Sequence, residues 1–243
     1  MVKSINFLDK LIFNYLGKEN TAILLSQTGF FMDCELNDGV LWAQFNDDNQ
    51  ITAIISGDNE KCVAFASENA DFEELSFVIN GTVLSSDKLP YKQIDKKYLM
   101  HISLDKIVAD KGIKYTQYGK IERLNDKLTP ENTTIKKFLH LKGCCEGAVI
   151  EKGLHTISGG FISFNKDLAF ISDVFTKEKY RGQGYGKAIV KKLLTLSPRK
   201  DIYLISRDYN IKFYEKLGFK VVKNIYEYTT KENWNVFWNQ WQN

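Results

Sequence analysis

Short apolar runs separated by polar turns fill the chain between residues 40 and 103. Three runs rich in β-branched and aromatic residues are interrupted by tetrads of Asn, Asp, Gly and Glu, a spacing typical of an antiparallel meander. A segment with a helical or extended apolar pattern follows, and then two short strands. The three runs are 40–45, 50–56 and 61–66, the segment is 71–79, and the strands are 82–86 and 98–103. This half of the chain is predicted to be α+β.

The pattern turns polar and weakly periodic over residues 104–129. This stretch marks the predicted boundary between two domains, 1–118 and 119–243. Beyond it, Pro130 stands in the first turn of a predicted helix that Gly143 ends. Strands are then expected at 147–151, 160–165 and 168–176, with a tight turn at Lys166–Asp167 between the last two.

With 44% hydrophobic and 13% aromatic residues in 243 positions, the chain can build a globular core. The apolar residues of the first twenty positions are broken by Asn6, Asp9, Lys10 and Asn14. Neither a signal peptide nor a membrane span is therefore expected, and the predicted location is the cytoplasm, with no membrane partner. Four cysteines without a CxxC pair indicate reduced thiols and no zinc site.

The net charge of +3 conceals an asymmetry between the two halves. Residues 1–120 hold 12 Lys and Arg against 17 Asp and Glu, whereas residues 121–243 hold 21 against 13. A basic half could serve nucleic acid, but its lysines are spread over many segments, and a polyphosphate cofactor would also need positive potential. Nucleic acid is therefore not the favoured partner.

A glycine-rich turn joins the strand that ends at Thr176 to an amphipathic helix. Its glycines stand at 182, 184 and 186. Backbone N–H groups at such a turn, together with the dipole of the helix that follows, favour a bound phosphate. Arg181 and Lys187 add positive charge. Neither the dinucleotide pattern GxGxxG nor the Walker pattern fits these positions.

The turn does fit the pattern Q/R-x-x-G-x-G/A, and at this point the chain resembles the GNAT superfamily of acetyl-CoA-dependent amine acetyltransferases. The stretch ISDVFTKEKYRGQGYG is similar to that family's fourth strand and pyrophosphate loop, and NIKFYEKLGF is similar to its later helix. The resemblance covers roughly residues 119–228. It implies a three-layer α+β fold, with a mixed, mostly antiparallel sheet flanked by helices. It also implies acetyl-CoA as acetyl donor, an amine as acceptor and no metal.

The resemblance also implies roles for individual residues. The backbone of Val174 and Thr176 is expected to bind the pantetheine arm, and a nearby strand bulge to direct an N–H at the thioester oxygen. Tyr214 stands where the family has a tyrosine that can protonate the departing thiolate. Arg207 and Asn210 stand where many members have an asparagine and an alanine, and Arg207 is expected to be a charged substitute for the CoA contact that the asparagine usually makes. The expected CoA-binding residues are Val174, Phe175, Thr176, Arg181, Gly182, Gln183, Gly184, Tyr185, Gly186, Lys187, Arg207 and Asn210.

The expected reaction is direct attack of a neutral amine on the thioester, without a covalent enzyme intermediate. The family's glutamate base aligns with Phe170, which gives weight to a water relay or a base supplied by the substrate. Asp173 is the nearest carboxylate before the turn, and it is either the general base or a structural partner of the backbone. Tyr214 is either the acid or a ring of the core, and His155 either reaches the site or is an ordinary surface or core histidine.

The first half repeats the order of the second, but the acidic stretch SENADFEEL replaces the glycine turn. Either this half is a degenerate copy of the same fold, whose carboxylates repel phosphate, or it is an unrelated α+β domain. A predicted C-terminal helix carries an aromatic stripe of Trp234, Phe237, Trp238 and Trp241. The stripe packs on its own domain, forms a homodimer contact or makes a lip of the substrate site.

The acceptor is expected to be a small amine, an amino acid or a peptide amino group. The alternative function is a sensor or scaffold that binds acetyl-CoA without turning it over. An intact glycine turn and Tyr214 favour the enzyme, whereas the missing glutamate weakly favours the sensor.

Overall fold

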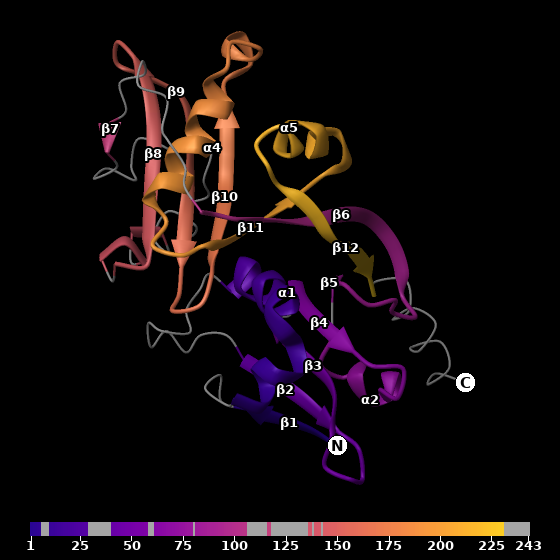
Figure 1. The fold of residues 1–243 in the computed structure, drawn as a ribbon. Helices are drawn as coiled ribbons and strands as arrows, with labels where there is room; N and C mark the ends of the chain where they lie inside the picture. The colour runs from indigo at the N-terminus through magenta and orange to yellow at the C-terminus, as the bar shows by residue number, and fades with distance from the viewer. Residues whose placement is uncertain are drawn as a thin grey trace.

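In the computed structural model, the structure describes residues 1–5, 10–28, 40–57, 61–79, 81–105, 116–117, 136–137, 139–141 and 143–230. The strands within these residues form one twelve-stranded sheet (Figure 1). Helices lie on both faces of the sheet, which is the layered α+β arrangement predicted above.

The first half of the chain supplies six strands. Strands β1 to β4 are antiparallel neighbours, whereas β5 runs parallel to β4. A parallel pair needs a crossover connection, and the one-turn helix α2 lies in that connection. The elements are β1 (Val2–Ile5), α1 (Lys10–Thr28), β2 (Val40–Phe45), β3 (Ile51–Gly57), β4 (Lys61–Ala66), α2 (Phe72–Leu75), β5 (Thr82–Ser85) and β6 (Lys92–Ser103).

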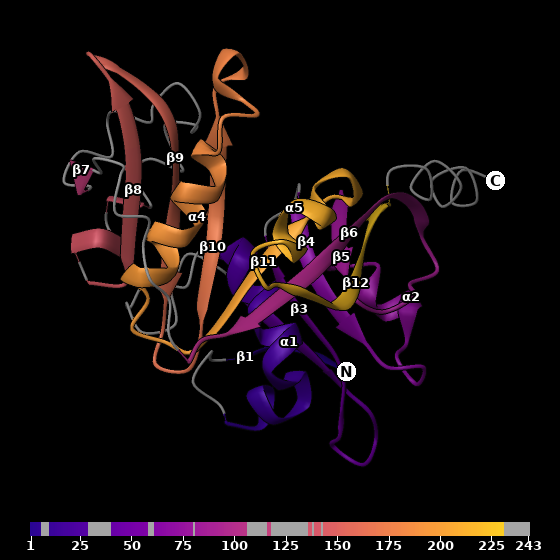
Figure 2. The same ribbon diagram turned by 45° about the horizontal axis from the view of Figure 1, so that its top comes forward.

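The second half repeats this plan. Strands β7 to β10 are antiparallel neighbours, and β11 runs parallel to β10 after the crossover helix α4. Helix α4 lies across β8, β9 and β10 (Figure 2). The elements are β7 (Thr116–Gln117), β8 (Cys145–Lys152), β9 (His155–Phe164), β10 (Ala169–Thr176), η3 (Glu178–Tyr180), α4 (Tyr185–Leu196), β11 (Asp201–Ser206), η4 (Asp208–Asn210), α5 (Ile211–Glu215) and β12 (Lys220–Thr229).

The order of strands across the sheet is the same from either end if β7 to β12 are taken as counterparts of β1 to β6. That order is β1-β2-β3-β4-β5-β12-β6-β11-β10-β9-β8-β7. The last strand of each half pairs with the fifth strand of the other half, and the two last strands pair with each other. The chain therefore consists of two tandem units that exchange their final strands, and the prediction of two related units is confirmed.

Side chains alternate along the strands and so divide the core between two faces. In β10 and β11, Ile171, Ile202 and Leu204 pack in the cluster of α4, whereas Phe170 and Tyr203 pack in the cluster of α1. Helices α1 and α4 therefore cover opposite faces of the sheet.

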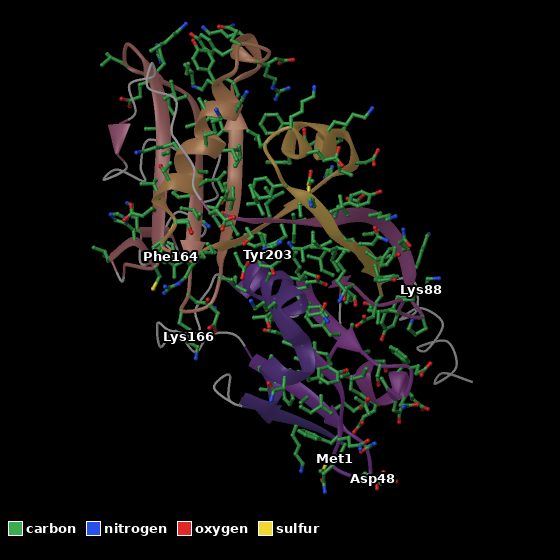
Figure 3. All side chains as sticks on the ribbon, viewed as in Figure 1. Met1, Asp48, Lys88, Phe164, Lys166 and Tyr203 are labelled. Carbon is green, nitrogen blue, oxygen red and sulfur yellow. The ribbon has the colours of Figure 1, made fainter. Side chains whose placement is uncertain are left out.

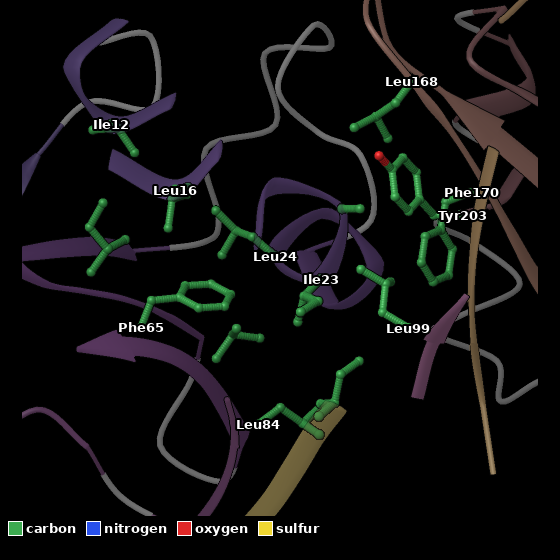
Figure 4. Close-up of a cluster of buried hydrophobic side chains, with 14 of the residues drawn as sticks. Ile12, Leu16, Ile23, Leu24, Phe65, Leu84, Leu99, Leu168, Phe170 and Tyr203 are labelled. Carbon is green, nitrogen blue, oxygen red and sulfur yellow. The ribbon is translucent and has the colours of Figure 1, made fainter. Parts of the chain in front are cut away.

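Helix α1 joins the two units through a shared hydrophobic core. Its buried residues Ile23 and Leu24 lie in one cluster with Phe65 of the first unit and with Phe170 and Tyr203 of the second (Figure 4). Tyr203 lies where α1 meets the second unit (Figure 3). The two units are thus packed together by apolar side chains as well as by strand pairing.

The predicted strands are present. Those at 40–45 and 61–66 have the predicted ends, the others have shifted ends, and the strand predicted at 98–103 begins earlier, at Lys92. The predicted aromatic stripe lies outside the described residues, as does most of the predicted helix after Pro130, of which residues 136–137 and 139–141 are seen to be helical. The predicted boundary between residues 118 and 119 also lies outside them and stays a prediction. No helix among the described residues has the length and apolar character to cross a membrane.

Candidate functional site

Strands β10 and β11 separate at a bulge in β10. Their parallel pairing ends at the pair Ile171 and Leu204. Just beyond, the register of β10 against β9 shifts between Ser172 and Phe175, and Asp173 has a φ of 54°. A residue in the left-handed region within a bulge bends the strand. The predicted bulge is therefore present. Within the described sheet, the edge of β10 that faces β11 has no strand partner beyond Ile171.

The glycine turn lies at the end of this open edge. Gly182 and Gly184 have φ values of 75° and 84°, which glycine adopts without strain. A Cβ atom on Gly186 would come within 3.3 Å of the Thr176 hydroxyl, so the third glycine allows the helix start to approach the strand closely. Arg181 Nε donates a hydrogen bond to the Thr176 carbonyl at 3.3 Å, which ties the turn to the end of β10.

The turn presents the N-terminus of α4 without a capping side chain. Gly184 is the N-cap, no side chain caps the helix, and no acidic residue stands in its first turn. The first N–H groups of a helix have no partners within the helix, and its dipole is positive at this end. Lys177, Lys179 and Lys187 add cations nearby in the sequence. The arrangement suits a polyphosphate.

The hairpin between β8 and β9 reaches this turn. Lys152 Nζ lies 5.3 Å and 5.4 Å from the ring centroids of Tyr180 and Tyr185. A hydrogen bond with Tyr185 raises the pKa of Lys152 above its usual value. His155, at the start of β9, is exposed at the same hairpin.

Tyr214 lies on α5, where its side chain and that of Phe213 pack against the hydrophobic cluster that contains the buried face of α4. Its ring contacts Phe213 and Phe219 edge to face, with centroids 4.9 Å and 5.9 Å apart. Burial raises the pKa of Tyr214 to about 12. The phenol is therefore protonated throughout the neutral range, as an acid must be before it acts, although the same ring also fills the core.

Arg207 and Asn210 follow β11 on the short helical turn η4. The Arg207 guanidinium is more than half exposed and lies 3.9 Å from the Asp95 carboxylate of β6, a strand of the first unit. Asn210 is exposed, and its side chain does not cap α5. Both residues thus stand beyond the open end of β11, and their predicted contacts with CoA stay predictions.

Asp173 at the bulge is not an isolated carboxylate. Ser172 Oγ donates a hydrogen bond to Asp173 Oδ2 at 2.8 Å, and Lys136 Nζ lies 3.6 Å from the same oxygen. The hydrogen bond and the ion pair hold the Asp173 carboxylate in place, so this geometry favours the structural role over the general base. The sequence analysis missed Lys136, because nothing local marks a lysine whose partners stand 36 residues further along.

In the first unit, protein groups occupy the helix start and the strand edge that are open in the second unit. The Asp71 carboxylate accepts hydrogen bonds from the N–H groups of Glu73 and Glu74 and so caps α2, the counterpart of α4. Beyond the end of the β4–β5 pairing, Asp87 Oδ2 accepts the Ala66 N–H at 3.1 Å. Asp87 is itself held in place, because the Tyr228 hydroxyl donates a hydrogen bond to its backbone carbonyl. The first unit therefore lacks both the uncapped helix start and the open strand edge that the second unit presents.

Buried thiols and metal-ligand clusters do not extend the site. Cys145 is buried, and burial raises the pKa of its thiol, which suits packing better than nucleophilic chemistry. In the part of the chain that the structure describes, no three His, Cys, Asp or Glu side chains are grouped as metal ligands.

Comparison with known proteins agrees with this geometry. Residues 143–221 match the family model of the acetyltransferase (GNAT) domain. Over 77 residues the chain is 32% identical to glucosamine 6-phosphate N-acetyltransferase from Trypanosoma brucei brucei, covering 30% of this chain and about half of that relative, 52%.

Two solved structures share the fold over nearly the whole chain. One is a GCN5-related N-acetyltransferase from Sphaerobacter thermophilus, with a TM-score of 0.61, 12% identity and coverage of 93% of this chain and 94% of that one. The other is a tandem GNAT protein from the clavulanic acid biosynthesis pathway, with a TM-score of 0.57, 9% identity and coverage of 94% and 97%. Residues 143–221, which carry the glycine turn and the separated strands, thus match the GNAT acetyltransferase domain, and the chain as a whole shares the fold of these two structures.

Proposed function

We propose that the chain is an N-acetyltransferase that moves the acetyl group of acetyl-CoA to a small primary amine by direct attack. The observation that carries the proposal is the uncapped N-terminus of α4 at the end of the open edge of β10. The backbone N–H groups of Gly182 to Lys187 would hold the pyrophosphate, and the edge of β10 at Val174 to Thr176 would hold the pantetheine arm.

Donor binding at this position brings the thioester towards the bulge. An N–H group at the bulge would stabilise the negative charge that develops on the thioester oxygen, and Tyr214 would give its proton to the leaving thiolate. An amine of ordinary basicity must first lose a proton, which costs about 4–5 kcal/mol at neutral pH. Because Asp173 is held by Ser172 and Lys136, we assign this deprotonation to water or to the substrate.

The relative named above acts on glucosamine 6-phosphate, so amino sugars belong in the acceptor panel together with amino acids and short peptides. The proposed location is the cytoplasm, and neither a membrane nor nucleic acid is proposed as a partner.

The test is thiol release from acetyl-CoA across that panel, with wild-type protein and the Tyr214→Phe variant. Turnover on at least one amine is expected, and loss of the acid should lower kcat by about 10²-fold while acetyl-CoA affinity is kept. Tyr209→Phe is the matched control, since Tyr209 is an exposed tyrosine on neighbouring η4. Tight acetyl-CoA binding without turnover on any amine would favour the sensor function instead.

A further inference from the structure

Lys136 is a largely buried cation beside the point where β10 and β11 separate. Its side chain is 14% exposed, and Nζ donates a hydrogen bond to Ser172 Oγ at 2.8 Å. The ammonium also lies 5.3 Å from the ring centroid of Phe161. Of the three N–H donors of the ammonium, only one has a hydrogen-bond acceptor among the described residues. A cation that is largely removed from water is stabilised by a further anionic contact.

The face of the sheet on which Lys136 lies determines from which side an acceptor can reach its ammonium group. Ser172 and Phe170 are two residues apart in β10 and so point to one face, the face opposite α4. The other face of the gap is covered by α4 and by Tyr214 of α5. With the donor held from the α4 side, an acceptor approaches the thioester from the side of Lys136.

The charge beside Lys136 is only partly balanced. Asp173 lies 3.6 Å from the ammonium, but it is 36% exposed and also accepts the Ser172 hydroxyl proton. An ammonium placed by an approaching acceptor would find a carboxylate at Asp173, and an anionic group on the same acceptor would find a cation at Lys136. Opposite charges set side by side in a partly desolvated site select ligands that carry both charges.

We infer that Lys136, Ser172 and Asp173 form an acceptor-recognition site that selects primary amines carrying an anionic group, with Lys136 as the contact for that anion. The inference rests on the proposed function and names its substrate class. Phosphate and carboxylate share the required chemistry. Polyamines lack an anionic group and would bring a further cation close to Lys136, so the site is not expected to select them.

The test compares acceptors in pairs that differ only in the anion. One pair is glucosamine 6-phosphate and glucosamine, which examines phosphate, and the other is 4-aminobutyrate and 4-aminobutanol, which examines carboxylate. For wild-type protein, kcat/KM is expected to be at least about tenfold higher for the anionic member of one pair, chiefly through KM. Equal values within both pairs would overturn the inference while leaving acetyl transfer intact.

Variants of Lys136 separate recognition from folding. In Lys136→Met, the kcat/KM values of the anionic and the neutral acceptor of a pair are expected to become about equal, without a matching loss of kcat for the neutral acceptor. Lys136→Arg should keep part of the preference, since it keeps the charge. Lys137→Met is the matched control, because Lys137 is the exposed neighbour in the same helical segment. An equal loss of kcat on both members of a pair would indicate a structural role and contradict the inference.

A binding measurement covers the case in which no acceptor is turned over. Calorimetry of glucosamine 6-phosphate and of 4-aminobutyrate with the CoA-loaded wild-type protein should show binding that the neutral partners lack. Inorganic phosphate should compete for that binding. If neither anionic probe binds, the recognition site is absent, whereas binding without turnover would retain the site and reject the proposed catalysis.

Discussion

Asp201 connects three elements through its two carboxylate oxygens. Oδ1 lies 2.9 Å from His101 Nε2 on β6, and Oδ2 accepts a hydrogen bond from Lys18 of α1 at 3.1 Å. Burial alone would raise the pKa of Asp201, but the hydrogen bonds from Lys18 and His101 outweigh burial and hold the pKa below its usual value. A single side chain at the start of β11 thus fastens the first unit to the second.

Replacing that carboxylate should weaken the fold in a pH-dependent way. A group whose pKa is lowered by folding stabilises the folded state above its unfolded pKa, and this contribution is lost as the pH falls through the folded pKa. Asp201→Asn should therefore lower the free energy of unfolding by about 1 kcal/mol at pH 7 and by much less near pH 3. Urea unfolding at both pH values measures the difference.

The control for this prediction is Asp48→Asn, at the exposed turn between β2 and β3. It should leave the free energy of unfolding within about 0.5 kcal/mol of wild type. If Asp201→Asn destabilised the protein equally at both pH values, the charge of Asp201 would not be the cause.

At the scale of elements, the glycine turn and the N-terminus of α4 together form the proposed pyrophosphate-binding site. Gly184 combines a left-handed backbone with the N-cap position, and a Cβ atom there would meet nothing within 4 Å. Gly184→Ala therefore introduces backbone strain of about 1–2 kcal/mol and no steric clash. A turn that relaxes this strain moves its N–H groups, so the Kd for acetyl-CoA should rise about tenfold.

Gly143→Ala is the matched control. Gly143 also has a left-handed φ, 72°, and open space around its Cβ position, but it stands before β8, outside the proposed site. Calorimetric titration with acetyl-CoA should give wild-type affinity for this variant despite similar strain. Equal losses of affinity in both variants would mean that general destabilisation lowers binding.

The elements that could be predicted from the sequence are those with local signals. The meander of β2 to β4 follows from apolar runs between polar turns, and the turn before α4 follows from three glycines within five residues. Only part of β6 was predicted, because residues 92–97 read KQIDKK and lack a buried face. The pairing of β6 with β11 and β12 leaves no local pattern, since strand partners are chosen by packing and register.

In the candidate site, too, the sequence could predict only those residues that carry a local signal. Its glycines and Tyr214 stand in motifs, whereas Lys136 and Asp173 meet only because a helical segment packs on β10. For the first unit, the sequence analysis expected acidic residues to repel phosphate. The structure shows in addition that two carboxylates are bound by the protein itself, Asp71 as helix cap and Asp87 as partner of the Ala66 N–H.

For the whole molecule, the capped helix and the occupied strand edge of the first unit predict the binding stoichiometry. With α2 capped by Asp71 and the Ala66 N–H bound by Asp87, only the second unit has an uncapped crossover helix beside an open strand edge among the described residues. Calorimetry should therefore give one acetyl-CoA per chain. Asp71→Ala should cost about 1 kcal/mol of stability through the lost cap and leave that stoichiometry at one. Two sites per chain in either protein would contradict the assignment.

The shared core predicts that the two units fold together. Residues 119–243 alone would lack β7 of their own unit and β6, the partner of both β11 and β12, as well as α1 and its apolar contacts with Phe170 and Tyr203. This fragment should show no cooperative thermal transition and no acetyl-CoA binding. Mixing it with residues 1–118 should restore both, as circular dichroism and calorimetry would record. A fragment that folds and binds alone would contradict this prediction.

The exchange of strands also has a consequence for synthesis on the ribosome. Synthesis of strand β5 is complete at Ser85, but its partner β12 is not complete until Thr229. Strand β6 is likewise made well before its partner β11. Translation of the roughly 125 residues from the end of β6 to the end of β12 takes about 6–25 s at ~5–20 residues per second. During that interval the nascent first unit exposes unpaired strand edges, which invite pairing with other chains. The completed carboxyl-terminal unit removes that exposure, so a truncated message would yield an aggregation-prone product.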